Sequence, residues 1–132
     1  MNELARGIRI VALTGALCFP TLGVGCQGGR SDADYVPVPG GSAERGAAVI
    51  QEVGCGTCHT IPGIRSARGM VGPPLTSWAR RSFIAGNLPN EPEGLMRWIM
   101  DAPSVEPGTA MPDLDVTPAQ ARDVAAYLYT LR

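Results

Sequence analysis

The sequence predicts a small all-α domain, and three observations support this prediction. Apolar residues recur at helical spacing behind helix-capping residues after Ser42, after Asn90 and after Thr117. Alternating runs of β-branched residues, which would indicate strands, are missing. Only 5% of the residues are aromatic, whereas Gly (17) and Pro (12) are abundant. A short, loop-rich chain with so few aromatic residues needs additional core material, and a large apolar cofactor would supply it.

Length and charge narrow the range of functions. The chain has 132 residues, which is enough for one ordinary domain. Counted from Cys26, nine arginines face eleven acidic residues, and the chain contains no lysine. This balance argues against nucleic acid as a partner. A lysine ring for docking an acidic partner is also absent, although Arg65 and Arg68 form a small basic patch near His59.

Residues 1–25 are interpreted as an export signal peptide. Arg6 and Arg9 precede an apolar run that is too short, and too interrupted by Gly and Pro20, for a membrane-spanning helix of about 20 residues. The run ends in TLGVGC, with small residues before Cys26, which resembles the processing site of bacterial lipoproteins. Lipidation of Cys26 is therefore expected. Cleavage nearby by an ordinary signal peptidase and an uncleaved anchor are the alternatives.

Residues 26–41 are rich in Gly, Pro and Ser and follow neither a strand nor a helix period, which predicts a flexible tether. Such a tether would reach about 50 Å at most. The folded domain is then expected to span residues 42–132. The expected location is the periplasm or the outer face of the cytoplasmic membrane, with the N-terminus as the membrane anchor.

The most informative motif is CGTCH, which contains Cys55, Cys58 and His59. Structural zinc requires four N or S ligands, and the predicted domain holds only these two cysteines and one histidine. A thioredoxin-like dithiol would start a helix after a strand, but the residues before Cys55 have a helical pattern. A structural disulfide would suit an exported protein, yet it would leave His59 without a role.

Covalent attachment of haem uses every residue of this motif. Each thiol adds to one vinyl group, and the adjacent histidine becomes an axial ligand of the iron. An export signal agrees with this interpretation because bacterial haem c is attached outside the cytoplasm. We therefore predict one covalent haem c on Cys55 and Cys58, with His59 as the proximal ligand.

The chain has no other histidine, so two histidine ligands are excluded unless a partner supplies the second one. A methionine is therefore the expected second axial ligand. Met70 follows His59 by only eleven residues, and Met96 and Met100 lie at the helical spacing typical of core residues. Met111 lies in a loop rich in Pro and Gly, from which a thioether can reach iron without distorting a helix. Met111 is the predicted ligand, and packing on the core is its alternative role.

The segments GCGTCHT, VGPPLT, LMRWI, PGTAMPD and AAYLYTL together resemble a small monohaem cytochrome c with His and Met ligands. The similarity extends from Ser42 to the end of the chain and is strongest to the haem c domain fused to subunit II of caa-type cytochrome oxidases. These 132 residues contain no copper-binding domain and no membrane hairpin, so a detached version of that domain is expected. The resemblance implies three to five helices wrapped around the haem. The first and last helices would cross at Gly46, against the face around Tyr127 and Leu128.

The resemblance also implies polar partners for the haem and its ligand. The carbonyl of Pro73 is expected to accept a hydrogen bond from the ring N–H of the proximal histidine, which orients the ring and strengthens its donation. Arg81 is expected to neutralise a haem propionate. Arg80 is the alternative for that position, and a solvated charge is the alternative role for Arg81.

Two tryptophans and a threonine complete the expected haem surroundings. Trp98 matches an aromatic residue beside the haem near the methionine, and Thr109 matches a hydroxyl near a propionate. Trp78 would either line the haem or be buried by the loop.

The predicted function is one-electron transfer in a respiratory chain, not enzymatic catalysis. Two axial side chains leave no site at iron for oxygen or a substrate, and a thioether ligand favours Fe(II). The expected direction is from a quinol-oxidising complex to a terminal oxidase, by way of the haem edge beside Cys55 and Cys58. One alternative is a cytochrome subunit bound permanently to a respiratory or photosynthetic complex. The other is a haem enzyme or sensor with an open iron site, in which Met111 does not bind.

Overall fold

The computed structural model describes residues 37–132, which form an all-α fold with one very short sheet. The helices of this part of the chain are α1 (Ala43–Val53), α2 (Pro92–Met100), α3 (Ala102–Val105) and α4 (Pro118–Leu128). They are joined by the 3-10 turns η2 (Cys55–Thr57) and η3 (Trp78–Arg80) and by an antiparallel pair, β1 (Phe83–Ile84) and β2 (Leu88–Pro89). The predicted fold class is confirmed. The predictions for the signal peptide, for Cys26 and for most of the tether fall outside the described residues.

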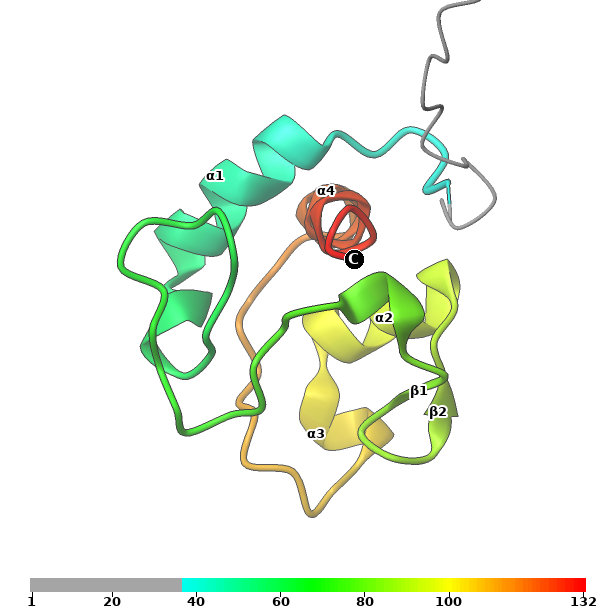
Figure 1. Ribbon diagram of the computed structural model, residues 1–132. Helices are drawn as coiled ribbons and strands as arrows, with labels where there is room; N and C mark the ends of the chain where they lie inside the picture. The colour runs from blue at the N-terminus through cyan, green and yellow to red at the C-terminus, as the bar shows by residue number, and fades with distance from the viewer. Residues whose placement is uncertain (1–36) are drawn as a thin grey trace, which may run out of the picture.

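α1 and α4 cross at one end of the domain, as predicted, and Figure 1 shows α4 nearly end-on beneath α1. Ser42 caps α1 by accepting a hydrogen bond from the backbone N–H of Arg45. At the crossing, a Cβ on Gly46 would lie 2.0 Å from the carbonyl oxygen of Asp123 and 3.0 Å from the Cβ of Tyr127. Only glycine allows the two backbones to approach this closely.

An ion pair between Arg45 and Asp123 joins α1 to α4 at the same crossing. The carboxylate of Asp123 accepts hydrogen bonds from Nε and Nη2 of Arg45, each at 2.7 Å, and from the backbone N–H of Ser42 at 2.8 Å. Asp123 is buried, and its hydrogen bonds to Arg45 and Ser42 lower the pKa of its carboxyl. No pattern in the sequence pointed to this pair, which joins the start of the domain to its last helix.

The last helix begins as predicted, but the start of α2 differs from the prediction. Thr117 and Gln120 form a reciprocal capping box at the start of α4. The sequence favours a second capping box at Asn90, whereas α2 begins at Pro92 with Glu91 at its N-cap and no side-chain cap bond. The side-chain amide of Asn90 instead bonds to two backbone carbonyls and one tyrosine hydroxyl outside α2. These hydrogen-bond partners lie 9 to 39 residues away in the sequence.

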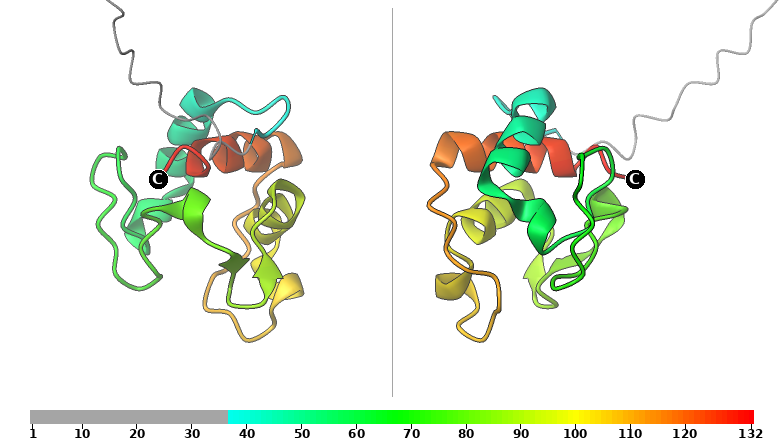
Figure 2. Two further views of the ribbon diagram at one scale, coloured as in Figure 1. Left: turned by 45° about the vertical axis from the view of Figure 1, so that its right-hand side comes forward. Right: turned by 90° about the vertical axis from the view of Figure 1, so that its left-hand side faces the viewer.

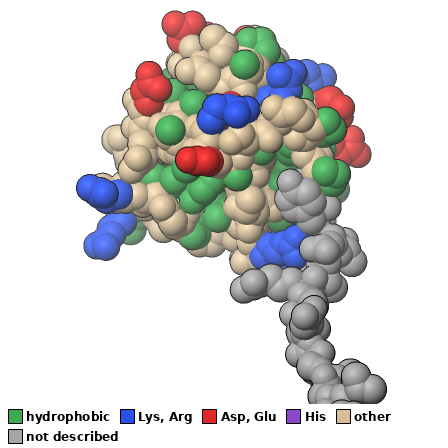
Figure 3. Space-filling model, turned by 90° about the horizontal axis from the view of Figure 1, so that it is seen from above, with side chains coloured by type: hydrophobic (Ala, Val, Ile, Leu, Met, Phe, Trp, Pro, Cys, Tyr) green, Lys and Arg blue, Asp and Glu red, His purple; other side chains and the backbone are tan. Residues whose placement is uncertain are grey.

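Loops form the other end of the domain. Figure 2 shows the connecting segments extending away from the α1–α4 crossing, with α2 and α3 beside them. The core between the two ends contains mainly aliphatic side chains, and its most deeply buried members include Ile50, Ile61, Ile84, Leu95 and Tyr129. Within residues 37–132, none of the helices is long and apolar enough to cross a membrane. Seen from above, basic and acidic side chains are interspersed on the surface (Figure 3).

Candidate cofactor site

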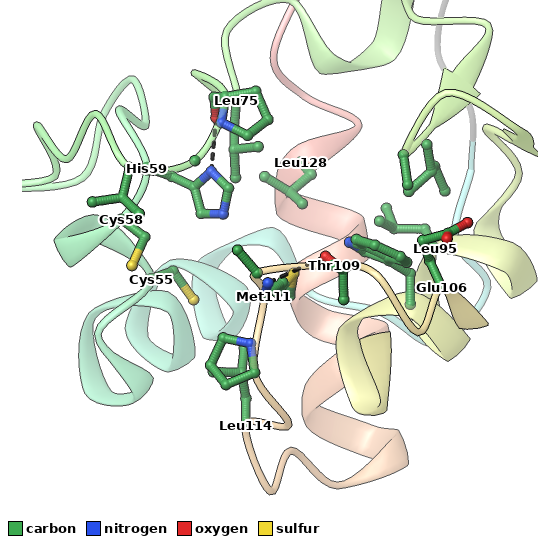
Figure 4. Close-up of a pocket in the computed structure, with 18 of the residues that line it drawn as sticks. Cys55, Cys58, His59, Leu75, Leu95, Glu106, Thr109, Met111, Leu114 and Leu128 are labelled. Atoms are coloured by element: carbon green, nitrogen blue, oxygen red, sulfur yellow. Dashed lines mark hydrogen bonds between the residues drawn. The ribbon is translucent and has the colours of Figure 1, made fainter. Parts of the chain in front are cut away.

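A largely apolar cavity of about 490 Å³ lies between the loops and the helices. This volume is in the range usual for small-molecule and cofactor sites. Figure 4 shows the two cysteines and His59 on one side of the cavity, with Thr109 and Met111 on the other. All eight haem-site residues proposed from the sequence line it, and these are Cys55, Cys58, His59, Pro73, Arg81, Trp98, Thr109 and Met111.

The CGTCH segment follows directly from the end of α1. Gly54 ends this helix in the left-handed conformation (φ 81°), which glycine adopts without steric cost, and its N–H bonds to the carbonyl of Ile50. The next turn, η2, is closed by hydrogen bonds from the backbone N–H groups of Cys58 and His59 to the carbonyl of Cys55. This turn therefore places two thiols and an imidazole at the edge of the cavity.

The two thiols are not joined to each other in the described structure. Burial raises the pKa of the Cys55 thiol above its ordinary value. Reactive dithiols have the opposite character, because a lowered pKa generates the nucleophilic thiolate. Cys55 therefore lacks the lowered pKa that is typical of reactive dithiols.

The His59 ring is oriented by a hydrogen bond, and a glycine lies close to it. Its Nδ1 lies 2.7 Å from the carbonyl oxygen of Pro73, the acceptor that the resemblance implies, and this leaves Nε2 available as a ligand. The ring also lies close to Gly72, where a Cβ would be 2.3 Å from Cε1 of His59, so this position leaves no room for a side chain. Gly72 was not among the residues singled out from the sequence. Its position directly before Pro73 in the VGPP segment is the signal that could have identified it.

Met111 comes from the loop between α3 and α4, 52 residues after His59. Its side chain is half-buried at the cavity, and its backbone N–H donates to Oγ1 of Thr109 at 3.2 Å. The other methionines of the described chain lie elsewhere. Met96 and Met100 pack against the apolar core, and Met70 is 91% exposed.

Arg81 and Trp78 provide polar groups at a third side of the cavity. The Arg81 guanidinium lies over the Trp78 ring, with Cζ 5.0 Å from the ring centroid, and it donates to the carbonyls of Pro74 and Thr76. Burial lowers the pKa of Arg81, although its guanidinium stays charged. Arg80 is exposed and does not line the cavity, so the structure favours Arg81 as the residue that faces a bound group.

The cavity fits the haem that the CGTCH motif implies. Its donor atoms are one imidazole nitrogen and one thioether sulfur, which are established axial ligands of haem iron. The indole Nε1 of Trp78 is buried and has no hydrogen-bond partner among the described residues. Buried polar atoms are rarely left unpaired, so a polar group outside the chain would be a suitable acceptor near this position.

Comparison with known proteins gives an independent result. Residues 43–132 match the model of the protein family described as Cytochrome c. Over 91 residues the chain is 35% identical to cytochrome c oxidase subunit 2 of Alkalihalophilus pseudofirmus, an alignment that covers 68% of this chain and 26% of that protein. The chain therefore spans about a quarter of the length of this relative. No solved structure shows a significant match.

Proposed function

The chain belongs to the cytochrome c family, and on this basis we propose that it carries single electrons with His59 and Met111 as the axial ligands of its haem. Haem c is the covalently bound cofactor of this family, and Cys55 and Cys58 are the two cysteines available for it in the described domain. The observation that carries the proposal is the convergence of one histidine and one loop methionine on a single apolar cavity beside these thiols.

The side chains around the cavity have distinct roles in this proposal. The Pro73 carbonyl would accept the Nδ1 proton of His59, which would leave Nε2 unprotonated and able to bind iron. Met111 contributes a soft sulfur, and together the two ligands exclude oxygen and substrates from the iron. Apolar walls from Leu75, Leu95 and their neighbours keep water away from the cofactor. When bound, the haem supplies an iron centre that alternates between Fe(III) and Fe(II).

A role in respiration is supported by the similarity to an oxidase subunit. We propose that the protein receives electrons from a quinol-oxidising complex and passes them to a terminal oxidase. The same similarity favours a second candidate, in which the domain is bound permanently to such a complex as one of its subunits.

The surface beside the cysteines suits contact with a redox partner. Met70 and Val71 are 91% and 80% exposed, and this segment is held against the CGTCH turn by two backbone hydrogen bonds, from Gly69 to Gly56 and from Gly72 to Cys58. Exposed apolar side chains on a firmly held backbone are suited to protein contacts. We propose that electrons enter or leave at this face.

The proposed location rests on the N-terminal sequence. A signal peptide over residues 1–25 and a lipidated Cys26 would place the domain on the outer face of the cytoplasmic membrane, within reach of membrane complexes. Mass spectrometry of the mature protein should show diacylglyceryl-modified Cys26 as its first residue. A mature form that begins elsewhere and washes off in salt would identify a periplasmic shuttle instead.

Replacement of Met111 tests the proposed function most directly. Met111→Ala should keep the haem attached but lose the weak Met–Fe absorption band near the red end of the visible spectrum. The variant should also bind carbon monoxide or cyanide and have a lower reduction potential.

Met100→Ala is the matched control, because Met100 packs on the core and does not line the cavity. It should lower the free energy of unfolding by about 2 kcal/mol, at the low end for a half-buried methionine, and keep the band. Loss of the band in Met100→Ala, with the band retained in Met111→Ala, would overturn the ligand assignment. An open iron site in the wild-type protein would favour an enzyme or sensor.

A further inference from the structure

The side chain of Asn90 is fully engaged although it caps no helix. Its Nδ2 donates to the backbone carbonyls of Trp78 and Arg81, both at 3.0 Å, and so bonds to both ends of the η3 turn. Its Oδ1 accepts a hydrogen bond from the hydroxyl of Tyr129 at 3.0 Å. The backbone N–H of Asn90 also donates to the carbonyl of Ser82 at 3.0 Å. One amide therefore ties the η3 turn to the end of the last helix.

Tyr129 is a rigid support for this amide. Its side chain is completely buried, and burial raises the pKa of its hydroxyl to about 12, so it remains a neutral donor at ordinary pH. A second bond joins the same two regions, because the backbone N–H of Ala79 donates to the carbonyl of Leu131 at 2.9 Å. Hydrogen bonds thus fix the η3 turn to the C-terminal segment, in addition to the bonds it makes with residues nearby in the sequence.

The η3 turn and the residue after it carry two of the cavity's polar side chains, Trp78 and Arg81. Arg81 lies over Trp78, and its guanidinium donates to the carbonyls of Pro74 and Thr76. The residue before Pro74 is Pro73, whose carbonyl accepts from His59. Hydrogen bonds therefore link Tyr129 through the Asn90 amide to the backbone of Arg81. The guanidinium of the same arginine bonds to the carbonyl of Pro74, the residue after the one that holds the His59 ring.

We propose that Asn90, supported by Tyr129, is a positioning residue for the haem site. It sets the backbone of Trp78 and Arg81, and through Arg81 it holds the segment that carries the Pro73 acceptor. The inference rests on the proposed roles of His59 and Arg81 at the haem. It adds to those roles two residues that do not line the cavity.

Four variants of the holoprotein test this proposal, with two readouts. The first readout is the reduction potential of the haem, and the second is the NMR signal of the His59 ring N–H in the ferrous protein. Asn90→Ala removes both carbonyl contacts, Tyr129→Phe removes only the support, and Arg81→Gln gives the reference effect of losing the guanidinium. Tyr127→Phe is the matched control, because it also removes one tyrosine hydroxyl bond, to the carbonyl of Pro62.

Arg81→Gln is expected to lower the reduction potential, because the haem propionate loses the positive charge that neutralises it. Asn90→Ala should shift the potential in the same direction, because the guanidinium is then less well placed. It should also shift the His59 N–H signal, and Tyr129→Phe should produce smaller shifts in the same directions. Tyr127→Phe should leave the potential at the wild-type value. Tyr129→Phe preserves the volume of the buried ring, so it keeps the test open if Asn90→Ala does not fold.

The two readouts separate failure of this proposal from failure of the proposed function. If Asn90→Ala and Tyr129→Phe reduce stability but leave both the potential and the His59 signal unchanged, Asn90 has only a structural role and the proposal is overturned. If Arg81→Gln leaves the potential unchanged, the proposed role of Arg81 at the haem is wrong. The His59 signal then decides alone, and an unchanged signal in Asn90→Ala overturns the positioning role as well.

Discussion

At the crossing of α1 and α4 the chain's own atoms fill the available space, whereas at the opposite end the side chains surround a cavity of about 490 Å³. The crossing is built from backbone contact at Gly46 and the buried Asp123 carboxylate. The cavity is built from loop residues whose mutual contacts leave room for a cofactor. One end of this small domain is thus completed by the polypeptide itself and the other by haem c.

Removal of the haem should cause the largest loss of stability, because it leaves the cavity end of the domain without its core. A protein with both Cys55→Ala and Cys58→Ala, purified free of haem, would leave the cavity unfilled. The cavity of about 490 Å³ has mainly apolar walls, and without haem these walls lose their packing partner and contact water. A small domain has only about 5–15 kcal/mol of stability, so we expect this loss to be comparable with the whole. We expect no cooperative thermal unfolding by circular dichroism. Cys55→Ala alone should keep one thioether and retain its haem after acid denaturation.

A cooperative transition in the haem-free double variant would contradict this prediction. It would mean that the helix crossing and the remaining core are sufficient to hold the loops, and that the haem adds function but little stability.

Gly46→Ala should destabilise the crossing of α1 and α4. Its Cβ would lie 2.0 Å from the carbonyl oxygen of Asp123, so the helices must separate. We expect a loss of about 3 kcal/mol in the free energy of unfolding, the upper end of the usual cost of overpacking, measured by urea denaturation. Because neither Gly46 nor Asp123 lines the cavity, the Met–Fe band should persist in the folded fraction.

Gly86→Ala is the control for this substitution. Gly86 has a φ of 86°, and no neighbouring atom lies within 4 Å of the position that an alanine Cβ would occupy. The change should therefore cost only the backbone strain of about 1 kcal/mol. Equal losses in the two variants would show that the close approach at Gly46 contributes little.

The ion pair at the crossing predicts a dependence of stability on pH. The hydrogen bonds from Arg45 lower the pKa of Asp123 below its ordinary value of about 3.8. The stabilisation is therefore complete above about pH 4 and is lost as the pH falls through the folded-state pKa. Asp123→Asn should cost about 2 kcal/mol at neutral pH and should flatten the acid limb of the stability profile in urea. Identical acid limbs in the two proteins would assign that limb to other carboxylates.

The smallest effect on stability is expected at the exposed rim of the cavity end. Met70→Ser should change the free energy of unfolding by less than about 0.5 kcal/mol, because this side chain is 91% exposed. It should nevertheless slow the oxidation of the reduced protein by membranes that contain the oxidase. Ala48→Ser, on the exposed side of α1, is the control and should leave this rate unchanged. Equal rates for all three proteins would place the partner's contact elsewhere.

Local features of the fold could be predicted because they depend on short sequence separations. Ser42 and Thr117 cap their helices as expected, since a cap bonds to a backbone N–H only three residues away. The CGTCH motif is similarly local. Met111 was chosen because it lies in a loop rich in Pro and Gly, whereas Met96 and Met100 have helical spacing. Both of these methionines pack on the core, as that spacing indicates.

The failure at Asn90 has the opposite cause. Its sequence context, with Glu93 three residues later, favours a capping box, but its amide bonds to Trp78, Arg81 and Tyr129, which lie 12, 9 and 39 residues away. A local pattern cannot show which distant carbonyls the folded chain brings within reach. For the same reason the Asp123 carboxylate was not recognised as the partner of Arg45, 78 residues before it.

The order of residues was therefore enough to predict the all-α class, the helix starts at Ser42 and Thr117, and a set of residues that the fold brings together around one cavity. Covalent attachment, ligation and capping each require particular side chains at particular short spacings, and such spacings can be read directly. Three further outcomes required the folded chain: Arg81 and not Arg80 lines the cavity, Gly72 leaves room for the His59 ring, and Asn90 bonds to the η3 turn. They depend on which distant backbone segments approach one another when the core closes, and the energy of that closure is distributed over many residues.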